Sequence, residues 1–265
     1  MKITTGGIST HYRIEGPAQG PAVMLSHSLA THLDMWEPQI GPLSARYQVL
    51  LYDTVGHGGT DAPPGPYTLN QLAEQALSLI DALGIERVHF VGLSMGGVVG
   101  QLLALAAPER LAGLVLCDTL SQVLPEDRPA WDKRMKIAEL QGMGSLADST
   151  IDRWFTPPFR ARNPEVVARI KAMILSTPPE GYIGCCHALA DLNLTDRLPS
   201  IKAPTLILVG EEDPGTPVEA SRVIYDRIAG SHLEIIPGAA HLSNIEQAAE
   251  FNRLLVKFLD HGTES

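Results

Sequence analysis

The 265-residue sequence lacks several features that mark whole classes of protein. Its three cysteines, Cys117, Cys185 and Cys186, cannot all pair, which is typical of reduced, intracellular cysteine usage. The nine histidines are scattered, without the closely spaced His or Cys pairs of a zinc site, so no metal is predicted. Aromatic residues make up only 5% of the chain and charged residues 19%, whereas 45% are hydrophobic. This composition excludes disordered and fibrous proteins and allows a sizeable core.

Positive charge and long apolar runs are also scarce. The 20 basic residues are outnumbered by 30 acidic ones, which gives a net charge of −10. Such a surface repels nucleic acid and anionic lipid, so neither partner is predicted, and an acidic substrate needs a local cluster of basic groups. The longest apolar run, Val98 to Ala107, is interrupted by Gln101. Neither a transmembrane helix nor a signal peptide is therefore predicted, and the expected location is the cytoplasm.

Strand and helix patterns alternate along most of the chain. Most of the strand patterns are apolar throughout, which predicts a sheet buried on both faces. The clearest helical spacing runs from Leu69 to Leu83, with Asn70 as the expected cap and Gly84 after its end. The alternation predicts an α/β fold with a mostly parallel, doubly wound sheet. The predicted strands are Ala22–Ser26, Tyr47–Tyr52, Arg87–Val91, Leu111–Cys117, Thr205–Val209 and Leu233–Ile236.

A helical region interrupts this alternation between about Ser121 and Asp196. Prolines separate amphipathic patterns there, and no strand pattern occurs. We therefore predict a helical cap at residues 121–196, inserted into a core made of residues 1–120 and 197–265. The expected cap helices are Trp131–Leu140, Leu146–Phe155, Pro164–Leu175 and Tyr182–Leu189.

One serine stands in a pattern typical of a nucleophile. Gly92-Leu93-Ser94-Met95-Gly96 follows the predicted strand Arg87–Val91 directly and opens the apolar helix Val98–Ala107. A sharp strand-to-helix turn needs small residues two positions before and after the serine, and it exposes the hydroxyl at a helix N-terminus. The alternative is a glycine-rich turn in which Ser94 only caps the helix.

A nucleophilic serine needs a base, and the base needs an acid that orients it. His241 follows one late predicted strand and Asp213 follows another, so both lie at the edge where open α/β sheets carry their chemistry. Asp213 and His241 are therefore the predicted acid and base, in the order serine, acid, histidine. Glu211, Glu212 and Asp118 remain alternatives for the acid, the last because it follows an earlier strand.

The backbone N–H groups of Leu29 and Met95 are the expected oxyanion hole. Met95 follows the serine, and Leu29 follows the strand after which the second donor is normally supplied. His57, in Gly56-His57-Gly58-Gly59, is interpreted as a residue that structures its loop.

Several motifs together resemble the α/β-hydrolase superfamily over essentially the whole chain and, more closely, the 3-oxoadipate enol-lactonases of bacterial aromatic degradation. The resemblance implies an α/β-hydrolase fold and hydrolysis of a five-membered enol lactone to 3-oxoadipate by Ser94, Asp213 and His241, without a cofactor. The motifs are Ser28–Thr31, Asp34–Gln39, Tyr52–Gly58, Ala62–Tyr67, Gly92–Gly97, Arg153–Pro157, Thr177–Tyr182 and His241–Asn244.

Two positions depart from the pattern of that family. His27 stands where an asparagine is expected and Val55 where an arginine is expected before Gly-His-Gly. Both are expected on loops that can face the pocket. Either a related lactone or ester is the substrate, or the two changes are neutral.

The cap offers candidates for binding an acidic small molecule. Trp131 and Arg134 lie three residues apart, so they share a helix face, and Arg153 precedes Trp154. We predict that Trp131, Arg134 and Trp154 bind the substrate, the arginine through its carboxylate. The alternative is that the tryptophans pack the cap on the core and the arginines are solvated.

Other functions fit the same motifs. A general carboxylesterase or a cofactor-free perhydrolase would keep the triad and act on another small ester or lactone. A small-molecule receptor on a hydrolase fold is a more remote alternative, and tight binding without turnover would distinguish it.

Overall fold

An eight-stranded sheet forms the centre of the structure, a computed structural model that describes residues 1–261. The strand order is β1-β2-β4-β3-β5-β6-β7-β8. Neighbours from β4 to β8 are parallel, whereas β1 with β2 and β2 with β4 are antiparallel. The strands are β1 Lys2–Thr5, β2 Ile8–Glu15, β3 Ala22–Ser26, β4 Gln48–Tyr52, β5 Val88–Leu93, β6 Leu111–Cys117, β7 Thr205–Gly210 and β8 His232–Ile236.

All six predicted strands are present, and the prediction of a mostly parallel α/β sheet is confirmed. Every residue of β5 and β7 is buried, as expected for apolar strands covered on both faces. The strand patterns missed β1 and β2. These two strands are only partly buried and contain several polar residues, so no continuous apolar run marks them.

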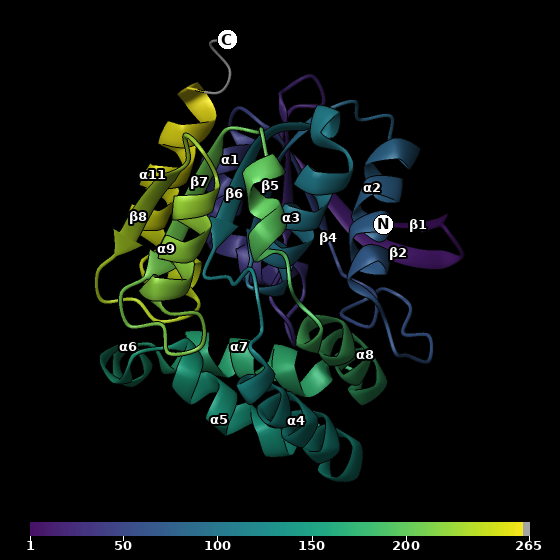
Figure 1. Cartoon of the computed structure of the whole chain (residues 1–265), viewed down its shortest axis with the longest axis vertical. Helices are drawn as coiled ribbons and strands as arrows, with labels where there is room; N and C mark the ends of the chain where they lie inside the picture. Colours follow the sequence, from purple (N-terminus) through teal and green to yellow (C-terminus); the bar gives the residue numbers. More distant parts are fainter. Residues whose placement is uncertain (262–265) are drawn as a thin grey trace.

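Helices cover both faces of the sheet (Figure 1). In that view α2, α3 and α9 lie in front of it, and α1 and α11 lie behind. The helices are α1 Glu37–Ser44, α2 Leu69–Ala82, α3 Met95–Ala106, α9 Val218–Arg227, the short α10 Ser243–Glu246 and α11 Ala248–His261. The helix predicted from Val98 begins three residues earlier, directly after Ser94. No helix within the described residues is long and apolar enough to cross a bilayer.

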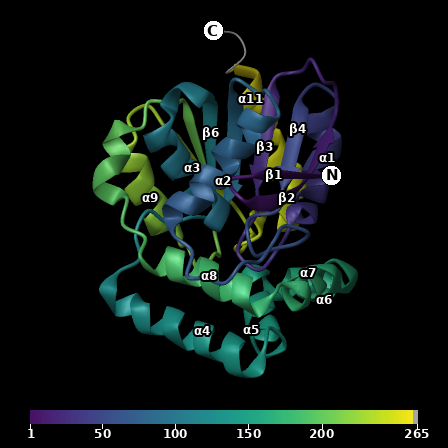
Figure 2. The same cartoon turned by 90° about the vertical axis from the view of Figure 1, so that its right-hand side faces the viewer.

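Five helices lie together at one end of the sheet, between β6 and β7 in the chain (Figures 1 and 2). We call residues 121–196 the cap; the final residues of the proposed core, 262–265, lie outside the described part of the chain. The sequence patterns missed α6, because its two prolines suggest a break, although they occupy its first turn. The cap helices are α4 Arg128–Gln141, α5 Gly144–Trp154, α6 Pro157–Arg162, α7 Pro164–Ser176 and α8 Pro179–Ala190.

Helix α2 has a different cap from the expected one. Thr68 Oγ1 accepts a hydrogen bond from the Gln71 N–H at 3.2 Å, and Gln71 Oε1 accepts one from the Thr68 N–H at 2.8 Å. This reciprocal pair is a capping box. Asn70 lies inside the first turn, so its assignment as the cap was wrong.

Replacing the cap residue should destabilise the protein more than replacing its neighbour. Thr68→Ala should lower the free energy of unfolding by about 1 kcal/mol, because a first-turn N–H group loses its acceptor. Asn70→Ala should leave it unchanged or raise it slightly, because alanine is the better helix former at that exposed position. Urea unfolding followed by circular dichroism measures both, and equal losses would contradict the assignment.

Candidate active site

Ser94 lies at a sharp turn between β5 and α3. Its backbone has φ +56° and ψ −114°, a region that non-glycine residues rarely adopt. Two hydrogen bonds hold the turn: the Ser94 N–H donates to the Cys117 carbonyl at 2.9 Å, and Thr119 Oγ1 donates to the Ser94 carbonyl at 2.8 Å. The side chain consequently faces a cavity between the sheet and the cap.

Two glycines make this turn possible. A Cβ atom on Gly92 would lie 2.1 Å from the Gly96 carbonyl oxygen, and one on Gly96 would lie 2.1 Å from the Ser26 carbonyl oxygen. Neither backbone neighbour can move aside, so larger residues are excluded at both positions. The requirement for small residues around the serine therefore has a direct steric cause.

His241 and Asp213 meet beside the same cavity. His241 Nδ1 lies 2.7 Å from Asp213 Oδ2, and both side chains line the cavity that Ser94 faces. Thr216 Oγ1 donates to the same carboxylate oxygen at 2.5 Å, and the N–H groups of Gly215 and Thr216 donate to Asp213 Oδ1 at 2.8 and 3.0 Å. With Nδ1 bonded to the carboxylate, Nε2 is the imidazole nitrogen left to accept a proton.

The pair is electrostatically coupled. Burial opposes ionisation of the Asp213 carboxyl, but the charge of His241 and the hydrogen bonds from His241 and Thr216 lower its pKa. Burial likewise opposes protonation of His241, but Asp213 raises the pKa of the imidazole above its usual value. This arrangement favours an imidazolium beside a carboxylate, which is the state that forms when a serine proton is taken up.

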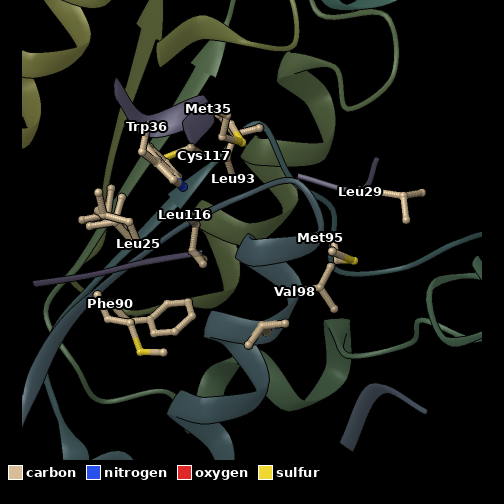
Figure 3. Packing of buried hydrophobic residues seen from close by; sticks show 14 of the residues in the cluster. Leu25, Leu29, Met35, Trp36, Phe90, Leu93, Met95, Val98, Leu116 and Cys117 are labelled. Atoms are coloured by element: carbon tan, nitrogen blue, oxygen red, sulfur yellow. The ribbon is translucent and has the colours of Figure 1, made fainter. Parts of the chain in front are cut away.

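The two residues of the expected oxyanion hole lie beside the cavity. Leu29 and Met95 both line the cavity, and Figure 3 shows Met95 and Val98 at the start of α3 with Leu29 on a neighbouring stretch of chain. As the first residue of α3, Met95 has an N–H group with no acceptor inside the helix. It can therefore donate to an oxyanion formed at Ser94.

Two buried histidines hold the loop that carries Leu29. His57 Nε2 accepts a hydrogen bond from the Ala30 N–H at 3.0 Å, and His27 Nδ1 lies 2.8 Å from the Ser28 carbonyl oxygen. His27 Nε2 accepts from the Thr54 N–H at 2.9 Å. Burial lowers the pKa of His27 to about 4 and that of His57 to about 3, so both are neutral and can act as acceptors at neutral pH.

The two departures from the enol-lactonase pattern do not face the cavity. His27 is fully buried and Val55 is 2% exposed, and neither is among the residues that line the cavity. The loop that follows His27 does line the cavity, through Ser28, Leu29 and Ala30, whereas His27 and Val55 themselves lie outside the lining. Each packs behind the site instead, where the Val55 N–H donates to Gln75 Oε1 at 2.8 Å.

The cap contributes aromatic and basic groups to the cavity. Trp131, Arg134, Arg153 and Trp154 all line it. The Arg134 guanidinium lies over the Trp131 ring, 5.2 Å from its centre, and the Trp154 ring stacks on His241 with 6.2 Å between ring centres. Trp131, Arg134 and Trp154 are therefore brought to the same cavity as the triad residues.

The comparisons with known proteins agree with this geometry. A family model described as the alpha/beta hydrolase fold matches residues 21–248. The chain belongs to the α/β-hydrolase family. It is 36% identical to 3-oxoadipate enol-lactonase 2 of Acinetobacter baylyi, over 94% of this chain and 92% of that protein. The resemblance inferred from the motifs is thereby confirmed.

Two solved structures are similar over nearly their whole length. The enol-lactonase from Burkholderia xenovorans LB400 has a TM-score of 0.95 and 39% identity, covering 98% of this chain and 100% of that one. A thermophilic esterase from Thermogutta terrifontis has a TM-score of 0.93 and 32% identity, covering 99% and 98%. This α/β-hydrolase is accordingly an ester or lactone hydrolase.

Glu246 is a residue of the site that the sequence did not reveal. Its buried carboxylate accepts hydrogen bonds from the Ala240 N–H at 2.9 Å, from the Thr156 N–H at 3.1 Å and from Thr156 Oγ1. It therefore joins the end of α5 to the loop that carries His241. Thr156 lies 90 residues away in the chain, so no local pattern signals the contact. Thr216, by contrast, lies only three residues after Asp213, so its contact with that carboxylate is local and could have been predicted from the sequence.

The alternative acids form no hydrogen bond with His241 in the described part of the chain. Asp118 is fully buried and accepts hydrogen bonds from the Gly210 N–H at 2.7 Å and Ser243 Oγ at 2.5 Å. Burial, and then the charge of Asp213, raise the pKa of Asp118 well above its usual value. Glu211 and Glu212 are exposed. Asp213 is thus the carboxylate in contact with His241.

Substituting the two buried aspartates should separate their roles. Asp213→Asn should lower kcat by about 10⁴ with little change in KM, because an amide stabilises the wrong imidazole tautomer. Asp118→Asn should cost several orders of magnitude less, since Asp118 bonds a backbone N–H and a serine rather than the base. Steady-state kinetics on a p-nitrophenyl ester, with melting curves to verify folding, measures this; the reverse ranking would contradict the assignment.

Proposed function

We propose that this chain opens the ring of 3-oxoadipate enol-lactone to give 3-oxoadipate, in the bacterial breakdown of aromatic compounds. The observation that carries the proposal is the pair of arginines, Arg134 and Arg153, in the same cavity as Ser94, Asp213 and His241. The enol lactone carries a free carboxylate as well as the reactive ester, and the cavity offers groups suited to each.

The two guanidinium groups are available to an anion. Among residues 1–261, no carboxylate lies within 4.0 Å of either one, and Arg153 only donates to Thr150 Oγ1 at 3.3 Å. Burial and the nearby charge of Arg134 lower the pKa of Arg153. The two positive charges therefore lie close together in a partly buried region. A bound carboxylate would relieve this repulsion and accept paired hydrogen bonds. In a chain of net charge −10, such a local cluster is what an acidic substrate needs.

The first half of the reaction forms an acyl-enzyme. Nε2 of His241 takes the Ser94 proton as Oγ attacks the lactone carbonyl, and Asp213 stabilises the resulting imidazolium. The N–H groups of Leu29 and Met95 donate to the oxyanion. When the intermediate collapses, the ring C–O bond breaks and the enol oxygen leaves, receiving the proton from His241. The enol then becomes a ketone, which favours ring opening.

The second half releases the acid. His241 takes a proton from a water molecule, whose oxygen attacks the acyl carbon, and the Ser94–acyl bond breaks as Oγ regains that proton. Trp154 stacks on the imidazole and Glu246 ties its loop to the cap, which restricts the orientations that the base can adopt through both steps.

Hydrolysis of a neutral ester, as by a carboxylesterase or a perhydrolase, is the second candidate. The similarity to the Thermogutta terrifontis esterase favours it, because the triad residues need no carboxylate on the substrate. A panel containing the enol lactone, saturated lactones and p-nitrophenyl esters separates the two. We expect kcat/KM to be highest for the enol lactone, and a neutral ester that exceeds it would contradict the proposal.

Replacing the nucleophile should abolish turnover while leaving the cavity intact. Ser94→Ala should remove covalent labelling by an organophosphonate and lower kcat by at least about 10⁴, leaving only the contribution of the oxyanion hole and binding. Mass spectrometry and steady-state kinetics measure the two effects. Retained activity would exclude Ser94 as the nucleophile.

Replacing an arginine should distinguish substrates by charge. Arg134→Ala should raise KM for the carboxylate-bearing enol lactone by about 10- to 100-fold, the value of a charge-assisted hydrogen bond, and have little effect on a neutral ester of similar size. Arg169→Ala is the matched control, because Arg169 is an exposed cap residue outside the cavity lining. An equal effect of Arg134→Ala on both substrates would remove this arginine from carboxylate binding.

A further inference from the structure

The cavity is larger than the proposed substrate requires. It has a volume of about 640 Å³ and extends from Ser94 to α9 and to the chain segment that leads into the cap. Volumes of roughly 300–1,000 Å³ typically hold drug-sized ligands, whereas the enol lactone has only about ten non-hydrogen atoms. Space therefore remains beyond the triad and the arginines.

The outer part of this space is apolar but open to water. Leu124 and Val223 line the cavity, yet they are 45% and 42% exposed. Pro217 and Ala220, also in the lining, continue this surface from α9 toward Thr216. Apolar side chains exposed at the rim of a cavity are stabilised when an apolar ligand covers them. We call Leu124, Pro217, Ala220 and Val223 the mouth residues.

The mouth lies between two parts of the fold. Val223 is on α9, which packs on β7 and β8, and Leu124 is on the segment between β6 and α4. Figure 2 shows α9 and the start of α4 on the same side of the molecule. A hydrogen bond of 2.8 Å between Ser121 Oγ and Thr195 Oγ1 joins the two chain segments that connect core and cap. The mouth therefore lies between α9 and a chain segment whose position is held by this hydrogen bond.

The charges at the mouth restrict what can occupy it. Asp127 and Glu219 line the cavity and are exposed, and neither forms an ion pair with another described residue. Two carboxylates disfavour an anionic group at this end, while Arg134 and Arg153 favour one deeper in the cap. The apolar side chains of the mouth have no group that binds a cation. The only groups there that could do so are the two carboxylates, which are solvated. A neutral hydrocarbon chain fits this surface best.

We propose that the mouth residues bind a neutral alkyl chain on the acyl part of an ester or lactone that the triad hydrolyses. This rests on the proposed function, since Ser94, Asp213 and His241 perform the hydrolysis, and it extends the substrate class from small lactones to esters with several additional methylene groups. The chain lies along Ala220 and Val223 on one side and Leu124 on the other, with the ester carbonyl at Ser94.

A homologous series of p-nitrophenyl esters, from acetate to octanoate, tests the mouth residues. In the unmodified protein kcat/KM should rise with chain length, by up to about fourfold per methylene, until the mouth is filled. Leu124→Gln and Val223→Ser should each lower the octanoate-to-acetate ratio of kcat/KM by at least about threefold. Leu140→Gln is the matched control, because Leu140 is 67% exposed on α4 and lies outside the cavity lining.

Three results would overturn the inference: a flat series in the unmodified protein, an unchanged ratio in both mouth variants, or an equal fall in Leu140→Gln. An ester of equal length ending in trimethylammonium that reacts faster than its neutral counterpart would also overturn it, in favour of a cation site at Asp127 and Glu219. Enol-lactone turnover, measured on the same preparations, separates the two proposals. If the enol lactone is hydrolysed but kcat/KM does not change with ester chain length, only the proposal for the mouth residues is contradicted. If kcat/KM rises with chain length but the enol lactone is not hydrolysed, only the enol-lactone assignment is contradicted.

Discussion

The strained backbone of Ser94 is the constraint on which the rest of the site depends. A residue with φ +56° costs roughly 1–3 kcal/mol, so the surrounding structure must hold it. Gly92 and Gly96 allow β5 and α3 to approach closely, and hydrogen bonds from Ser94 to Cys117 and from Thr119 to Ser94 fix the turn against β6. The central sheet thereby holds Ser94, the proposed nucleophile, rigidly and places a helix N-terminus beside it.

The cap is linked to His241, the proposed base. Glu246 connects the His241 loop to Thr156, the Leu242 N–H donates to the Trp154 carbonyl at 3.1 Å, and the Trp154 ring stacks on the imidazole. The helices that line the cavity therefore also contact His241 and its loop. A displacement of α5 would move the cavity lining and the contacts of this imidazole together.

Charge is distributed unevenly around the cavity. The loop that carries Leu29 is held by two neutral histidines, because burial lowers the pKa of His27 and of His57 and keeps both unprotonated. The positive charge comes from Arg134 and Arg153 in the cap, against an excess of acidic residues elsewhere. Within this cavity the guanidinium groups thus lie on the cap side.

The sequence by itself determined the features that depend on a few neighbouring residues. Apolar runs predicted six strands, and the glycines around Ser94 predicted its turn, because the close approach of Gly92 to Gly96 is a local steric requirement. Positions directly after strands predicted Asp213 and His241, since parallel strands bring their carboxyl ends to one edge.

Only the tertiary structure decided which side chains face the cavity and which distant residues touch. His27 and Val55 lie outside the cavity lining. Arg153 joins Arg134 in that lining, and Glu246 meets Thr156, because these contacts depend on how the cap packs on the core and not on local spacing.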